Sequence, residues 1–123
     1  MKKTIRVIAI AIVAVMLMCC CTFAKTASWY YEGYQANAWL NVSSTRSNYG
    51  LSYNGDTGSL NIGFSASLIY ADNSVGCAND SVDGTVPSIS GSSTYSTCIW
   101  VDAEADYTVA SDYEHYVGVT YVG

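Results

Sequence analysis

Trp39 and three amide side chains form the most chemically suggestive pattern in this sequence. Trp39 falls in the polar register of an alternating segment, where Gln35, Asn37 and Asn41 share its face. An indole ring can stack on the flat face of a sugar while amide groups hydrogen-bond to the sugar hydroxyls. The pattern therefore predicts a glycan-binding surface, and the alternative is that Trp39 only packs against neighbouring strands.

A second tryptophan, Trp100, lies close to a cysteine. Strict alternation puts Trp100 and Cys98 on one polar face. Cys77 and Cys98 are the only cysteines in the second half of the chain, and an isolated pair in an exported protein is typical of a disulfide. This disulfide would pull the long loop predicted over 71–93 across that face. Trp100 is then either a further ligand-binding residue or covered by the loop.

Five acidic residues offer the oxygen ligands that calcium prefers. Asp102, Glu104 and Asp106 occupy alternate positions of one predicted strand, so neighbouring carboxylates lie about 7 Å apart on one face. Asp80 and Asp83 belong to a polar segment dense in oxygen donors that does not match the EF-hand spacing. The interpretation we favour for these residues is a solvated acidic face that maintains solubility and prevents edge pairing. The alternative is a calcium site, and no other cofactor is expected.

Patterns typical of enzymes are scarce in the sequence. The chain has one histidine, His115, in the apolar register of a C-terminal strand. It has no nucleophile elbow, phosphate-binding loop or zinc-protease motif. The composition is compatible with a paired-carboxylate site, but a small domain of strands rarely supplies the deep cleft that such a site needs. We therefore expect a protein without enzymatic activity.

The start of the chain has the layout of a secretory signal peptide over 1–24. Basic residues at 2–6 precede an apolar run, and the small residues Thr22 and Ala24 suit a cut after Ala24. A cut after Ala27 is the alternative. Two other interpretations stay open, an uncleaved membrane anchor and a lipoprotein attached through a cysteine of the leader. The expected localisation is secreted or extracellular.

Removal of this leader would leave a strongly acidic protein. Ten acidic residues would then stand against Lys25 and Arg46. Such a chain cannot neutralise a phosphate backbone, which excludes nucleic acid as a partner. An anionic membrane surface is excluded for the same reason. The expected partners are a neutral glycan or an extracellular protein, with no preference for an oligomeric state.

Apolar and polar residues alternate with a period of two after the leader, as they do in half-buried strands. The alternation predicts strands over 34–43, 48–54 and 59–68. The Gly-Asp-Thr-Gly sequence at 55–58 is a hairpin signal between the last two. These three strands are therefore expected to form an antiparallel meander.

The second half of the chain is less uniform. Residues 71–93 alternate weakly and predict a long loop with one short edge strand near 85–90. Alternation resumes over 95–109 and continues in a last strand. The chain is expected to fold as a single all-β domain over 28–123. We predict a small antiparallel β-sandwich or flattened barrel of about five to six strands, after a cleaved N-terminal signal peptide.

In its layout, a leader followed by a small domain rich in Tyr, Ser and Gly, the chain resembles the lactococcin 972 type of bacteriocin. That resemblance implies a secreted antibacterial protein and carries over no individual residue. The residues themselves favour a small secreted, non-enzymatic binding module for a cell-wall glycan or an extracellular protein. The alternatives are a bacteriocin-like antibacterial protein and a calcium-stabilised extracellular structural protein.

Overall fold

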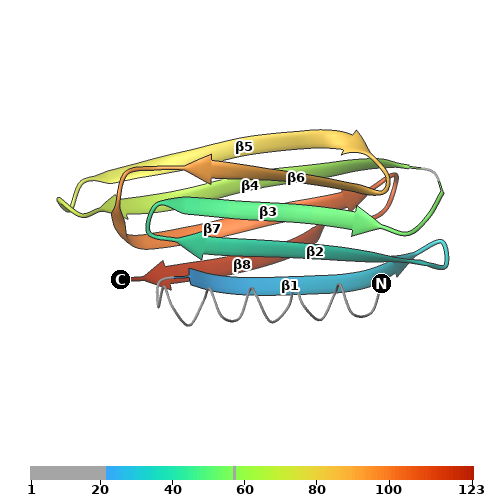
Figure 1. Ribbon diagram of the computed structural model, residues 1–123, viewed down its shortest axis with the longest axis horizontal. Helices are drawn as coiled ribbons and strands as arrows, with labels where there is room; N and C mark the ends of the chain where they lie inside the picture. The colour runs from blue at the N-terminus through green and yellow to red at the C-terminus, as the bar shows by residue number, and fades with distance from the viewer. Residues whose placement is uncertain (1–21, 57) are drawn as a thin grey trace, which may run out of the picture.

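The computed structural model describes residues 22–56 and 58–123, and all regular structure in these residues is β-strand (Figure 1). No helix long and apolar enough to cross a membrane occurs among them. The eight described strands are β1 (Thr22–Tyr31), β2 (Tyr34–Ser43), β3 (Arg46–Tyr53), β4 (Ser59–Tyr70), β5 (Val75–Thr85), β6 (Ser88–Thr94), β7 (Cys98–Val109) and β8 (His115–Val122).

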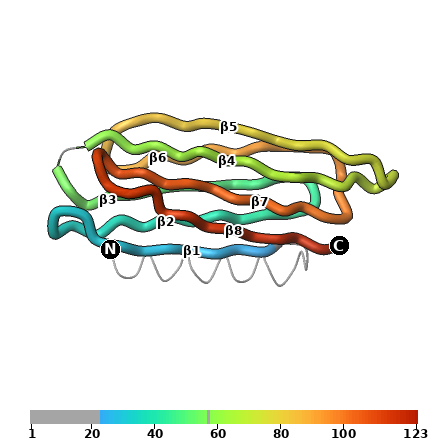
Figure 2. The backbone as a smooth tube through the Cα atoms, turned by 180° about the vertical axis from the view of Figure 1, so that it is seen from behind, coloured from blue at the N-terminus to red at the C-terminus, as the bar shows by residue number. Residues whose placement is uncertain are grey.

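The strands form two antiparallel sheets that pack face to face (Figures 1 and 2). Sheet A has the order β1-β2-β3-β6, and sheet B has the order β5-β4-β7-β8. At the two sides of the sandwich, β1 contacts β8 and β5 contacts β6. The all-β sandwich is as predicted, but it has eight described strands rather than five to six.

Residues 1–21 of the signal peptide predicted over 1–24 lie outside the described residues, and its last three residues belong to β1. Its cleavage, and the alternatives of an anchor or a lipid, stay predictions. β1 begins at Thr22, before the expected domain start at Ser28, and pairs with β2 along its whole length. A cut after Ala24 would leave most of β1 in place, whereas a cut after Ala27 would remove more than half of it.

The predicted meander is wrong at one turn. β2 and β3 pair as expected, with Leu40 beside Tyr49. The chain at 54–58 then crosses to the other sheet, so β3 and β4 face each other across the core instead of pairing. The rings of Tyr49 and Phe64, which the meander would have placed on paired strands, stack across the core with centroids 4.6 Å apart. Both topologies bury the same residues, and alternation alone does not distinguish them.

The predicted loop over 71–93 is also wrong, because these residues form most of β5 and β6. Several inward positions of these strands hold glycine or alanine, namely Gly76, Ala78, Gly84 and Gly91, where β5 and β6 come together at one side of the sandwich. A Cβ atom on Gly91 would lie 2.7 Å from atoms of both Tyr49 and Val82, closer than real Cβ contacts. Because there is no space for larger side chains at these positions, the apolar–polar alternation that marks a strand in the sequence is weak here. The expected short edge strand near 85–90 corresponds to β6.

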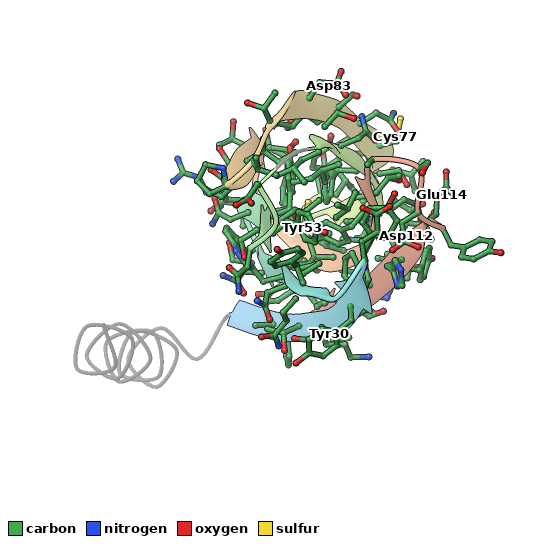
Figure 3. All side chains as sticks on the ribbon, turned by 90° about the vertical axis from the view of Figure 1, so that its right-hand side faces the viewer. Tyr30, Tyr53, Cys77, Asp83, Asp112 and Glu114 are labelled. Carbon is green, nitrogen blue, oxygen red and sulfur yellow. The ribbon has the colours of Figure 1, made fainter. Side chains whose placement is uncertain are left out.

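A β-bulge in β7 decides where the cysteines point. The register between β4 and β7 shifts by one residue and leaves Ile99 without a partner on β4. The extra residue reverses the alternation, so Trp100 faces outward while Cys98 is buried with 2% exposure. Cys77 lies on the outer side of β5 (Figure 3), and both thiols are free. The predicted Cys77–Cys98 disulfide is therefore absent, because the two side chains lie on opposite faces of one sheet.

The two thiols are expected to react at very different rates. Cys77 is exposed, whereas burial raises the pKa of the Cys98 thiol and keeps it protonated. An alkylating reagent should modify Cys77 in the native protein and reach Cys98 only after denaturation, as measured by peptide mass spectrometry. Recovery of the two peptides joined by a disulfide would contradict this arrangement.

Candidate functional site

The outer face of sheet A consists of small, hydroxyl and amide side chains around one tryptophan. Arg46, the first residue of β3, is the charged residue that strand register places on this face among the described strands, because Lys25 on β1 has the opposite register. A surface without opposed charges suits a neutral ligand. Strand pairing places the following residues on this face: Ala24, Thr26, Ser28, Tyr30, Gln35, Asn37, Trp39, Asn41, Asn48, Gly50, Ser52, Ser88, Ser90 and Ser92.

Trp39 lies at the centre of this face, between Thr26 on β1 and Gly50 on β3. A Cβ atom on Gly50 would lie well under 3.0 Å from three indole atoms, Cζ2, Cε2 and Nε1, and at nearly the same distance from each. The ring therefore turns one face toward the bare backbone of Gly50. A glycine is needed at this position because any side chain would displace the indole.

A hollow of about 310 Å³ lies beside the indole. Ala24, Thr26, Trp39 and Asn41 line it. This volume is at the lower end of the range of about 300–1,000 Å³ typical of small-molecule sites. The small side chains of β1 leave space next to the ring, and Asn41 supplies an amide at its rim. A cut after Ala24 would remove one of the two β1 residues that line the hollow, and a cut after Ala27 would remove both.

The backbone of β2 is held from the opposite sheet at the point where Trp39 projects outward. The hydroxyl of the fully buried Tyr107 donates a hydrogen bond to the carbonyl oxygen of Trp39. Burial raises the pKa of Tyr107, which keeps this hydroxyl protonated and able to donate. The position of the indole is thus tied to the core of the sandwich.

Asn37 lies on the same face of β2, two residues before Trp39. Its Oδ1 accepts a hydrogen bond of 2.7 Å from the Ser28 hydroxyl. This contact fixes the orientation of the amide and leaves its two N–H groups as donors for other partners. The structure therefore offers an oriented amide donor at Asn37, and Asn41 supplies a second amide that lines the hollow.

Tyr30 is a residue of this face that sequence analysis missed. It pairs with Gln35, is 72% exposed and projects from the outer side of β1 (Figure 3). Gln35 and Trp39 are four residues apart on β2, so Tyr30 and Trp39 lie about 13 Å apart along the strands. The site therefore has two aromatic rings at a spacing that suits an extended ligand.

β1 is fixed against sheet B by aromatic packing on its inner side. The rings of Trp29 and His115 stack with centroids 3.8 Å apart. His115 also lies 3.2 Å from the Asp112 carboxylate, and the Tyr31 hydroxyl is 2.9 Å from that of Ser111. His115 is a partly buried residue of β8. Its stacking on Trp29 fixes the position of β1, which forms one side of the site.

The sequence-predicted ligand residues divide between the two sheets. Gln35, Asn37, Trp39 and Asn41 share one face as expected. Trp100 does not join them, because it lies on the outer face of sheet B. It is not covered by a loop either. The predicted glycan surface is therefore confined to sheet A.

The carboxylates predicted to bind calcium on β7 lie in a row on the outer face of sheet B. Asp102 accepts a hydrogen bond of 3.0 Å from Thr120. Glu104 accepts hydrogen bonds from Ser65 and Tyr116. Neighbouring strands therefore already supply donors to these carboxylates.

The second predicted pair of calcium ligands is separated by the strand itself. Asp80 points inward and accepts a hydrogen bond from Tyr49, whereas Asp83 points outward and accepts one from Asn61. Because their side chains lie on opposite faces of β5, Asp80 and Asp83 cannot share an ion. Among the described residues, no group of three or more His, Cys, Asp and Glu side chains is placed to hold a metal. The three β7 carboxylates thus share one face as expected, whereas Asp80 and Asp83 do not, and calcium binding stays a prediction.

Comparison with known proteins gives this chain no relative. No family model, no curated protein and no solved structure matches it significantly. The resemblance in layout to bacteriocins therefore stays a prediction, and the function is argued from the site itself.

Proposed function

We propose that this protein is a secreted, non-enzymatic module that binds a neutral cell-wall or extracellular polysaccharide through the outer face of sheet A. The observation that carries the proposal is the Trp39 indole, which lies over Gly50 beside a hollow lined by small and amide side chains. Aromatic stacking with amide hydrogen bonds is the usual way in which proteins recognise a neutral sugar.

An extended sugar chain fits this face better than a single sugar does. The rings of Trp39 and Tyr30 lie about 13 Å apart along the strands, so a polysaccharide parallel to β2 would contact both. Asn37 and Gln35 lie on the path between the two rings. None of the outward positions on the described strands of this face carries a carboxylate, which supports binding without hydrolysis.

The replacement Trp39→Ala tests this proposal. Purified wild-type protein should be retained on insoluble chitin, cellulose or cell-wall preparations, with a change in tryptophan fluorescence. Trp39→Ala should weaken retention by at least about tenfold, because a central aromatic contact typically contributes more than the 1.4 kcal/mol that this factor represents. Circular dichroism should show a folded protein, because Trp39 lies on the surface and not in the core.

Trp100→Ala is the matched control, since it removes the same side chain from the other sheet and should leave retention unchanged. Failure of the wild-type protein to bind any of these preparations would overturn the proposal. The remaining expectations would then be an extracellular protein receptor and a bacteriocin-like role, which a growth-inhibition assay separates.

A further inference from the structure

An exposed apolar row crosses one end of the outer face of sheet B. Strand pairing places Val75, Ile69, Trp100 and Val122 side by side on β5, β4, β7 and β8. Val75 is 79% exposed and Val122 is 65% exposed. Single exposed apolar residues are ordinary, but a contiguous row across four strands is typical of an interaction surface.

The bulge in β7 enlarges this row. Because β7 has one extra residue there, both Trp100 and its neighbour Ile99 are turned away from the core, and Ile99 is 38% exposed. A regular strand would have buried one of the two. Bulges are common where a strand redirects a side chain for binding.

Acidic side chains continue from this row along the middle of the same face. Asp102, Glu104 and Asp106 follow Trp100 at alternate positions of β7, in steps of about 7 Å. The lysine and arginine residues after position 21 are Lys25 and Arg46, which lie in sheet A. The negative charge on sheet B is therefore not neutralised by basic side chains of its own strands.

The pKa values of two groups on this face, Asp106 and Tyr116, are raised above their ordinary values. Burial and the nearby Glu114 and Glu104 carboxylates raise the pKa of Asp106. The hydrogen bond to Glu104 raises the pKa of Tyr116 to about 12. A cationic ligand on this face would be attracted by carboxylates that repel one another in its absence.

We infer that the apolar row and the three β7 carboxylates, here called the acidic–apolar face, bind a cationic polypeptide in an extended conformation. Its lysine or arginine side chains would lie along Asp102, Glu104 and Asp106, and an apolar residue would pack on Trp100 and Val122. The step of about 7 Å between the carboxylates equals the spacing of alternate residues in an extended chain. Charge complementarity selects this partner, because a second copy of this acidic chain is repelled and a neutral polysaccharide would leave the carboxylate charges without a counter-charge.

Short labelled peptides test this inference by fluorescence anisotropy. The probe is a peptide of lysine alternating with threonine, with leucine at one end. One control peptide has glutamate in place of each lysine, and another has serine in place of the leucine. The basic, leucine-ended peptide should bind at least about tenfold more tightly than either control, and its affinity should fall as salt is added.

Two variants locate the binding surface. Val75→Ser with Val122→Ser should weaken peptide binding by about tenfold, as should Asp102→Asn with Glu104→Gln. All four side chains are exposed, so the fold should persist, and retention on polysaccharide should be unchanged. Trp39→Ala is the matched control that should bind the peptide normally. Because Trp39→Ala should weaken retention on polysaccharide but not peptide binding, this variant also distinguishes the inference from the proposed function.

Equal binding of the basic and acidic peptides, or wild-type affinity in both double variants, would overturn the inference. Concentration-dependent dimerisation that Val75→Ser with Val122→Ser abolishes, without peptide binding, would overturn it too and identify the row as a self-association surface.

Discussion

Replacing Gly50 by alanine is expected to weaken polysaccharide binding by at least about tenfold while the sandwich stays folded. The added Cβ atom would lie well under 3.0 Å from three atoms of the Trp39 indole. The indole is partly exposed, so it will turn away before the β3 backbone moves. Its stacking face is then misplaced and the hollow beside it changes shape, although Trp39 itself is still present.

Gly63→Ala is the matched control for this substitution. Gly63 lies in β4, and a Cβ atom there would meet nothing within 4 Å. This variant should bind normally and gain up to about 1 kcal/mol in unfolding free energy, because alanine restricts the unfolded chain. Retention on polysaccharide, the tryptophan emission spectrum and urea unfolding distinguish the two variants. Normal retention of Gly50→Ala would show that the position of the indole is unimportant, which contradicts the proposed site.

The two outer faces of the sandwich differ in a way that the net charge of the chain conceals. Sheet A carries amides, hydroxyls and aromatic rings, and sheet B carries the β7 carboxylates beside an apolar row. One small domain therefore presents a neutral face and an acidic face on opposite sides. If both proposals hold, the protein can attach a cationic partner to a polysaccharide, because neither ligand competes for the other's surface.

Alternation predicted the burial of individual residues well and the topology poorly. Leu40, Tyr49, Leu51, Ile62 and Phe64 are all buried as expected. The alternation could not show which strands pair, because a hairpin and a crossing between sheets bury the same side chains. β5 and β6 were missed because small or polar residues, among them Gly76, Ala78 and Asp80, occupy most of their inner positions, so apolar alternation is weak there. The bulge at Ile99 was missed because one inserted residue leaves no signal in composition.

The candidate site was predictable where it lies within one strand. Trp39 and the amides of β2 share a face because they alternate in sequence, whereas Tyr30 joins them only through pairing of β1 with β2. A signal for that pairing was present at Glu32 and Gly33, which both adopt positive φ, at 51° and 84°, in the tight turn between the strands. Such a two-residue turn is typical of a β-hairpin. Recognising it would have placed Tyr30 beside Gln35.

The other large expected effect is a loss of stability above pH 10. Tyr49 and Tyr107 are completely buried, and this burial raises the pKa of both, that of Tyr49 to about 12 with a further contribution from its hydrogen bond to Asp80. The unfolded chain ionises near pH 10, whereas the folded state resists ionisation. Stability is therefore full below pH 10 and falls as the pH rises toward 12 and beyond.

Each buried tyrosine lowers the unfolding free energy by at most about 1.4 kcal/mol per pH unit in this range. The contribution of Tyr49 lies below this ceiling, because its hydrogen-bond partners Asp80 and Ser93 are partly exposed and solvent screens the charge. Urea unfolding followed by circular dichroism at increasing pH measures the slope. Tyr107→Phe should reduce it, whereas Tyr30→Phe and Tyr113→Phe should not, since those two side chains are 72% and 86% exposed.

The alkaline transition also connects the core to the candidate site. Once Tyr107 loses its proton, its oxygen can no longer donate to the carbonyl oxygen of Trp39. Retention on polysaccharide should therefore disappear over the same pH range as the native circular dichroism signal, and Tyr107→Phe should bind more weakly than wild type even at neutral pH. Ionisation of all eleven tyrosines near pH 10, with the native signal and binding both preserved, would contradict the buried positions of Tyr49 and Tyr107.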